Sequence, residues 1–140
     1  MQLSWLEIPV VHQNLIRTHV DTHPATEVCG LIGGLWQPYP RLARAFQVVP
    51  IANIDPHPAV RYTMDPQAQI EAILAFDQRG WDVVGIYHSH PHGTPIPSAT
   101  DLAEANYPDA VYVIGVPHGA LRAWRIIRGA AHPAELHVVG

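Results

Sequence analysis

The chain has 140 residues, 48% of them hydrophobic and 14% charged, with a formal net charge of −4 at pH 7. We therefore expect residues 1–140 to form one domain with a sizeable core, and the unclustered basic residues make nucleic acid a poor partner. A single cysteine, Cys29, excludes an internal disulfide. No signal-peptide pattern and no apolar run near the ~20 residues of a membrane span are found, so we expect a cytoplasmic protein without membrane contact.

The first half of the chain predicts two helices and a hairpin. A proline opens the first helix, which carries apolar residues at helical spacing, while Asp65 and Pro66 predict the N-cap and first residue of the second. An apolar stripe of Ile70, Ile73 and Leu74 supports that second helix. In chain order we expect a helix at 9–21, a buried strand at 28–36, its hairpin partner at 43–50, a short strand at 61–64 and a helix from 66 that Gly80 ends.

The second half predicts mostly strands. In chain order we expect a continuous apolar strand at 83–90, a short helix at 99–106, and strands at 110–116, 119–128 and 134–139. Strands and helices mix without regular alternation, which predicts an α+β domain with a mixed central β-sheet flanked by helices.

Two histidines stand one residue apart at the end of the apolar strand 83–90. Residues i and i+2 of a strand share a face, so His88 and His90 present their imidazoles together. Two imidazoles and a carboxylate suit a catalytic zinc ion, with a fourth position left for water. Asp101 is the carboxylate we select, since it lies in the first turn of the expected helix at 99–106, where the helix dipole favours the ionised form.

Each of these residues has a simpler interpretation. Ser98 and Asp101 also have the spacing of a helix capping box, and an isolated His-x-His at a strand end is more often two surface histidines. The combination of apolar strand, His-x-His and capping sequence favours the metal site. Hydrolysis also needs a proton acceptor, and Glu27, at the start of the strand 28–36, is available although it could equally be an exposed strand-end residue.

These residues carry a resemblance. Glu27, His88, His90, Ser98 and Asp101 match the pattern Glu…His-x-His-x(7)-Ser-x(2)-Asp of the JAMM (MPN+) zinc metalloprotease family without a departure. The flanking stretches "EVCGLIGG" and "VVGIYHSHPHGTPIPSATD" are similar to the same family, and to its prokaryotic stand-alone members in the second case. The resemblance covers most of residues 8–116 and implies a cytidine-deaminase-like α+β fold.

The resemblance also implies roles. His88, His90 and Asp101 would bind one zinc ion, Glu27 would accept a proton from the attacking water and pass it to the leaving amine, and Ser98 would hydrogen-bond the oxyanion. Ser89, between the ligands, is expected to point to the opposite face. The family cuts peptide or isopeptide bonds after a C-terminal Gly-Gly, so the implied partner is a ubiquitin-like or sulfur-carrier protein whose extended tail adds to a strand edge beside the metal.

Rival readings remain open at this point. A zinc amidase or peptidase acting on small-molecule, phage-tail or cell-wall-related peptide amides would use the same residues. A catalytically silent scaffold is disfavoured because every ligand is present. Cys29 as a nucleophile paired with His88 is also disfavoured, because the metal site already accounts for that histidine.

Overall fold

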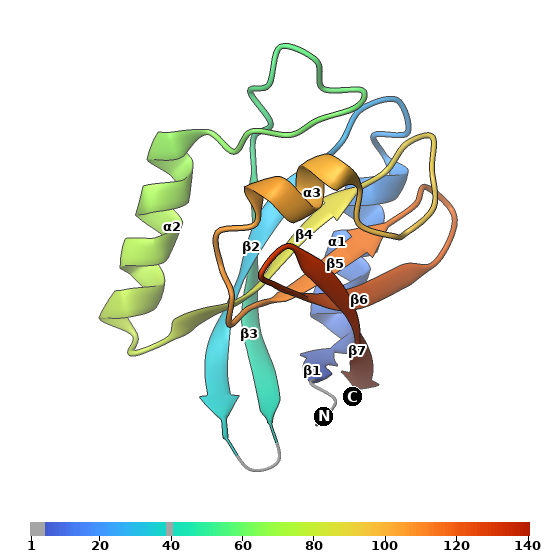
Figure 1. Cartoon of the computed structure of the whole chain (residues 1–140). Helices are drawn as coiled ribbons and strands as arrows, with labels where there is room; N and C mark the ends of the chain where they lie inside the picture. The colour runs from blue at the N-terminus through green and yellow to red at the C-terminus, as the bar shows by residue number, and fades with distance from the viewer. Residues whose placement is uncertain (1–4, 39–40) are drawn as a thin grey trace.

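The computed structural model describes residues 5–38 and 41–140 (Figure 1). Within these residues the three helices are α1 (Val10–Asp21), α2 (Pro66–Gln78) and α3 (Ala99–Glu104). The strands are β1 (Trp5–Pro9), β2 (Cys29–Gln37), β3 (Leu42–Ile51), β4 (Asp82–Ser89), β5 (Val111–Gly115), β6 (Leu121–Ile127) and β7 (Ala130–Val139). None of these helices is long and apolar enough to cross a membrane.

The strands close into a barrel in the order β1-β3-β2-β4-β5-β6-β7. Strand β1 pairs in parallel with both β3 and β7, β4 pairs in parallel with β5, and the remaining pairs are antiparallel. The expected mixture of helices with a mixed sheet is thus confirmed. The expectation of a central sheet flanked by helices needs correction, because β1 joins the two ends of the sheet and closes it.

The sequence analysis missed β1. Its residues alternate as a strand should, since Leu6 and Ile8 are fully buried while Trp5 and Glu7 are partly exposed. Five residues carry too little pattern to distinguish a strand from an N-terminal extension. Only the distant partners of β1 reveal its role, because Trp5 lies beside Leu42 of β3 on one side and beside β7 on the other.

Two apolar clusters pack on opposite faces of the central strands. The first contains α1 residues such as Ile16 and Val20 together with Tyr87 of β4. The second contains Phe76 of α2 and Ile86 of β4. From Ile86 onward, successive residues of β4 therefore face the α2 side and the α1 side in turn, and this alternation decides which of its terminal side chains share a face.

Several local expectations differ from the structure. The predicted strand at 61–64 is absent, with Met64 forming only an isolated bridge to Asn53. Strand β7 begins at Ala130, four residues earlier than expected, because the tight turn at Arg128 and Gly129 (φ 54° and 75°) reverses the chain before the sequence Ala-Ala-His-Pro.

Helix α2 has the expected start and end but buries a different face. Gly80 follows its C-terminus with φ 73°, and Asp65 occupies the N-cap position without making a side-chain cap. The buried residues are Ala72 and Phe76, whereas Ile70 and Leu74 of the expected stripe are more than half exposed. Phe76 lies so close to Gly33 of β2 that any Cβ there would clash with its ring, so this glycine selects the face that the helix buries.

Candidate metal centre

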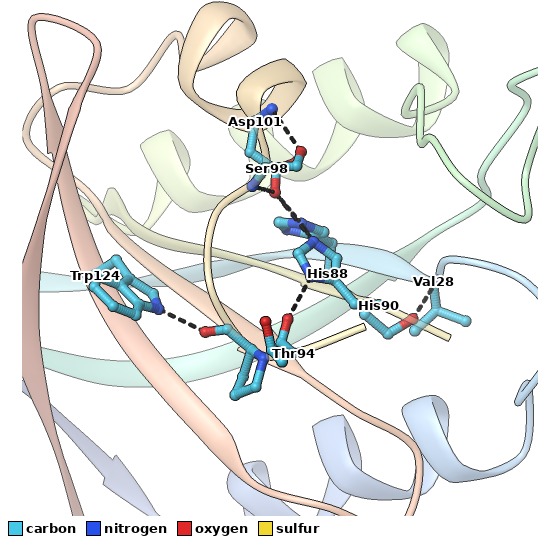
Figure 2. A network of polar contacts seen from close by, with 9 residues as sticks. Val28, His88, His90, Thr94, Ser98, Asp101 and Trp124 are labelled. Carbon is cyan, nitrogen blue, oxygen red and sulfur yellow. Dashed lines mark hydrogen bonds and ion pairs between the residues drawn. The ribbon is translucent and has the colours of Figure 1, made fainter. Parts of the chain in front are cut away.

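The end of β4 brings two imidazoles to one face of the sheet. His88 is almost fully buried and pairs with Cys29 of β2 and Ile114 of β5. His90 follows the last strand residue and remains in line, because its N–H donates to the carbonyl of Gly115 at 2.9 Å. Both side chains point to the side of the sheet where α3 lies (Figure 2).

Helix α3 supplies the carboxylate through a complete capping box. The Ser98 hydroxyl oxygen accepts from the Asp101 N–H at 3.1 Å, and Asp101 Oδ2 accepts from the Ser98 N–H at 2.9 Å. Asp101 Oδ2 is also the oxygen that faces the two histidines, at 3.2 Å from His88 Nε2 and 3.1 Å from His90 Nε2. The capping interpretation of this Ser-x-x-Asp sequence and its metal-site interpretation are therefore compatible, because the cap fixes the rotamer of the carboxylate.

The three atoms form a triangle that fits a small cation. The third side, from His88 Nε2 to His90 Nε2, measures 3.1 Å. His90 Nδ1 is 2.7 Å from the Thr94 carbonyl, which only an N–H can satisfy, so the Nε2 atom of the neutral ring carries a lone pair toward Asp101. A tetrahedral zinc ion with bonds of about 2.0–2.1 Å separates its ligand atoms by about 3.3–3.4 Å. Within the described residues this is the one cluster of three or more such side chains that could hold a metal ion.

Groups behind the two histidines hold the rings in place by different means. The Thr94 carbonyl orients His90 through the hydrogen bond to Nδ1. His88 is held by packing, since the Tyr62 ring lies against it with centroids 4.7 Å apart and planes inclined by 30°. The Nδ1 atom of His88 is buried and has no hydrogen-bond partner among the described residues.

Burial and charge set the protonation of the cluster. Burial opposes ionisation of Asp101, but the close contacts of its carboxylate with the His88 and His90 rings outweigh burial and hold the pKa of this carboxyl far below its usual range. Burial lowers the pKa of His88, whereas the contacts of His90 with Asp101 and Thr94 outweigh burial and raise the pKa of His90. An ionised carboxylate beside a neutral, buried imidazole is the state that metal binding requires.

Glu27 lies beside this cluster, two residues before β2. Its backbone is fixed at both ends, because its N–H donates to the Pro58 carbonyl at 2.7 Å and its carbonyl accepts from Asn53 Nδ2 at 2.9 Å. The side chain is 7% exposed, and no group within the described residues hydrogen-bonds to its carboxylate. Burial raises the pKa of Glu27 to about 7, with His90 opposing and Asp101 adding to the rise.

Ser89 joins the segment of Glu27 to the end of β4 that carries the two histidines. As the neighbour of His88 in β4 it lies on the opposite face, and its hydroxyl accepts from the Val28 N–H at 2.9 Å while its own N–H donates to the Val28 carbonyl at 3.1 Å. The segment that carries Glu27 is thereby fixed against the end of β4. The sequence analysis expected the direction of this side chain but not its bond to Val28.

A pocket of about 580 Å³ opens next to the cluster, between the segment 62–69, β4 and the end of α3. Tyr62 forms part of its wall, so the same residue lines the pocket and contacts His88. Glu104, Tyr107 and Tyr112 also line it. No motif in the sequence indicated this pocket, because its walls come from four separate segments.

The structure thus brings His88, His90 and Asp101 into direct contact and places Ser98 beside Asp101. Cys29 is fully buried, its thiol faces the Ile51 carbonyl at 3.4 Å, and burial raises its pKa to about 12, which argues against a nucleophilic role. Two residues that contact the ligands or their loop, Tyr62 and Trp124, were not identified from the sequence, and no local signal could have identified them.

A barrel of mixed strands with this His-x-His and Ser-x-x-Asp arrangement at its rim defines a JAB-type domain. A family model described as prokaryotic homologs of the JAB domain matches residues 9–127, and the chain belongs to this family. The JAMM-type resemblance noted in the sequence is thereby confirmed.

Similar proteins carry peptidase names. The chain is 39% identical over 100 residues to a desampylase of Haloferax volcanii, covering 71% of this chain and 69% of that protein. It is 31% identical over 131 residues to a CysO-cysteine peptidase of Mycobacterium tuberculosis, covering 90% and 86%. A probable TtuB-protein conjugate cleaving protease of Thermus thermophilus is 38% identical over 74 residues, covering 53% and 48%.

The fold also matches a solved structure. The solution structure of protein DSY2949 from Desulfitobacterium hafniense superposes with a TM-score of 0.83 at 25% identity, covering 96% of this chain and 92% of the other. The barrel described above is therefore the fold of a natural relative over nearly its whole length.

Proposed function

We propose that this protein is a zinc-dependent peptidase that cleaves the bond after the C-terminal Gly-Gly of a ubiquitin-like or sulfur-carrier protein. The observation that carries the proposal is the triangle of His88 Nε2, His90 Nε2 and Asp101 Oδ2, with mutual distances of 3.1–3.2 Å, in a chain of the JAB family. Glu27, buried beside the triangle and with no hydrogen bond to its carboxylate from the described residues, supplies the proton acceptor that such a reaction needs.

In this proposal different residues hold the metal and transfer the proton. A zinc ion held by His88, His90 and Asp101 would polarise the scissile carbonyl and make water a stronger acid. Glu27 takes a proton from the attacking water and returns it to the departing nitrogen. A pKa near 7 suits both steps, because the same carboxyl must accept and then release a proton near neutral pH.

Ser98 is proposed to stabilise the oxyanion. Its oxygen accepts the Asp101 N–H, but a hydroxyl has a second lone pair and one proton of its own. The proton is free to be donated toward the negative charge that develops on the carbonyl oxygen. Ser98 is exposed at the start of α3, so a substrate can reach it. The cap therefore fixes the Ser98 hydroxyl in place and leaves its proton available for donation.

The substrate class is taken from the relatives and from the shape of the site. Relatives named desampylase, CysO-cysteine peptidase and probable TtuB-protein conjugate cleaving protease favour a protein tail over a free small molecule. Beside the cluster, β4 is paired with β2 on one side and with β5 on the other, so this strand offers the tail no free edge. We propose that the tail instead lies against Tyr62 in the neighbouring pocket.

The test compares conjugates that differ only at the last residue of the carrier. Carrier–cysteine and carrier–lysine conjugates ending in Gly-Gly or Gly-Val are incubated with the wild type and with Glu27→Gln, and amine release is followed by mass spectrometry. We expect release only from Gly-Gly conjugates, since a Cβ beside the reacting carbonyl displaces it and a misplacement of about 1 Å costs on the order of 10² in rate. Equal cleavage of both tails, or hydrolysis of generic peptide amides alone, would favour the amidase alternative.

A further inference from the structure

The loop that joins the two histidines to Asp101 is largely exposed. Residues 91–97 contain three prolines, and the side chains of His92 and Ile96 are directed to solvent. This loop nevertheless carries the carbonyl of Thr94, which holds the ring of His90. The orientation of a proposed metal ligand therefore depends on a segment with little packing of its own.

One side chain from the barrel wall anchors this loop. Trp124 Nε1 donates to the Pro95 carbonyl at 2.8 Å, and the neighbouring Thr94 carbonyl accepts from His90 Nδ1 at 2.7 Å (Figure 2). The two carbonyls belong to consecutive residues. A shift of the Pro95 carbonyl therefore moves the Thr94 carbonyl. The indole N–H and the imidazole N–H thus hold the loop at two adjacent carbonyls.

The anchor is more deeply buried than the loop. Trp124 is 8% exposed, belongs to the apolar cluster on the α2 side and lies in β6 opposite Tyr112 of β5. The guanidinium of Arg122 lies 5.0 Å from the centroid of its ring. Because the strand and the apolar cluster fix the indole, its N–H defines where the loop carbonyls can lie.

We propose that Trp124 is a positioning residue for His90: it fixes the Thr94 carbonyl and, through it, the tautomer and ring plane that present Nε2 to the metal. The proposal rests on the proposed metal site but not on the proposed substrate. Partners that orient a ligating histidine typically contribute about 10–100-fold to metal affinity. Trp124 contacts the loop and not His90 itself. We therefore expect its indole N–H to contribute as much to metal affinity as a single neutral hydrogen bond, about two- to tenfold.

The test removes the indole N–H and follows the metal directly. Trp124→Phe is compared with Trp36→Phe, a matched control near the end of β2 remote from the Cys29–His88 pair. We measure transfer of zinc from the loaded protein to a chelator and the absorption spectrum of the Co²⁺-substituted protein, which reports ligand geometry. We expect Trp124→Phe to release zinc about two- to tenfold faster and to alter the Co²⁺ spectrum, with Trp36→Phe unchanged.

Unchanged zinc release and an unchanged Co²⁺ spectrum in a folded Trp124→Phe protein would overturn the proposal. If that variant does not fold, the test is made on the wild type by NMR. The ¹⁵N-indole resonance of Trp124 should then shift on zinc loading more than that of Trp36. Equal shifts of the two resonances would overturn the proposal. Neither readout requires a substrate. A protein that binds zinc as expected but cleaves no Gly-Gly conjugate would refute the proposed function alone.

Discussion

Replacing Glu27 by glutamine separates the chemistry of this carboxyl from its effect on folding. The amide keeps the size of the side chain but cannot accept a proton. We expect the zinc content to stay unchanged and hydrolysis to fall by about 10²–10⁴-fold. No neighbouring acid can substitute, because Asp101 faces the histidines and Asp55 is bound to Thr63 and to the backbone of His57.

The same substitution should stabilise the metal-free protein. Burial raises the pKa of Glu27 from 4.5 to about 7. A difference of one in pKa corresponds to about 1.4 kcal/mol, so keeping the carboxylate ionised in the folded state costs about 3 kcal/mol above pH 7. Because the folded state binds the proton more tightly than the unfolded state, this cost is absent below pH 4.5 and grows as the pH rises to 7.

Chemical denaturation of the metal-free proteins measures this balance. Burying the amide offsets part of the gain. We therefore expect the free energy of unfolding of Glu27→Gln to exceed that of the wild type by about 1–3 kcal/mol at pH 8, and to show no gain near pH 4. Glu71→Gln, at an exposed position of α2, serves as the control and should show no such pH-dependent gain. An equal difference between Glu27→Gln and wild type at both pH values would refute the assigned burial cost, and full hydrolytic activity would refute the assigned base.

Three further outcomes are expected. His88→Ala and Asp101→Ala should each lose zinc and hydrolysis together, as elemental analysis and activity measured on the same sample would show; retention of one equivalent of zinc would contradict the ligand assignment. Ser98→Ala should lower kcat by about 10²–10³-fold at unchanged zinc content and lower stability by about 1 kcal/mol through loss of the cap, measured by steady-state kinetics and thermal unfolding; an unchanged kcat would contradict oxyanion stabilisation. Zinc affinity should weaken as the pH falls below about 6, because protons compete for the imidazoles and the raised pKa of His90 makes it the first to be protonated; competition titrations at several pH values check this, and a pH-independent affinity would contradict it.

The features that were predictable from sequence are those whose causes are local. Asp65 and Pro66 mark the start of α2, and Gly80 marks its end, because each acts on the backbone of its own turn. The spacing of His88 and His90 predicts a shared face for the same reason, since strand alternation needs no distant partner. The capping box of Ser98 and Asp101 is equally local.

The features that were missed depend on distant contacts. Strand β1 becomes a strand only when it meets β3 and β7, which lie far along the chain. The face that α2 buries is chosen by Gly33, some 40 residues earlier, rather than by the hydrophobicity of α2 itself. Trp124 meets Pro95 across 29 residues, and no spacing rule connects an indole in one strand to a loop carbonyl in another segment.

The closure of the barrel also bears on how such a protein behaves at high concentration. Exposed strand edges are templates on which other chains add and aggregate. Here each strand within the described residues has a neighbour on both sides, although β3 pairs with β1 only at residues 42–44, and the parallel pairing of β1 with β7 covers what would otherwise be two terminal edges. The closed order of the strands therefore leaves few free edges on which a second copy of this chain could add as an extra strand.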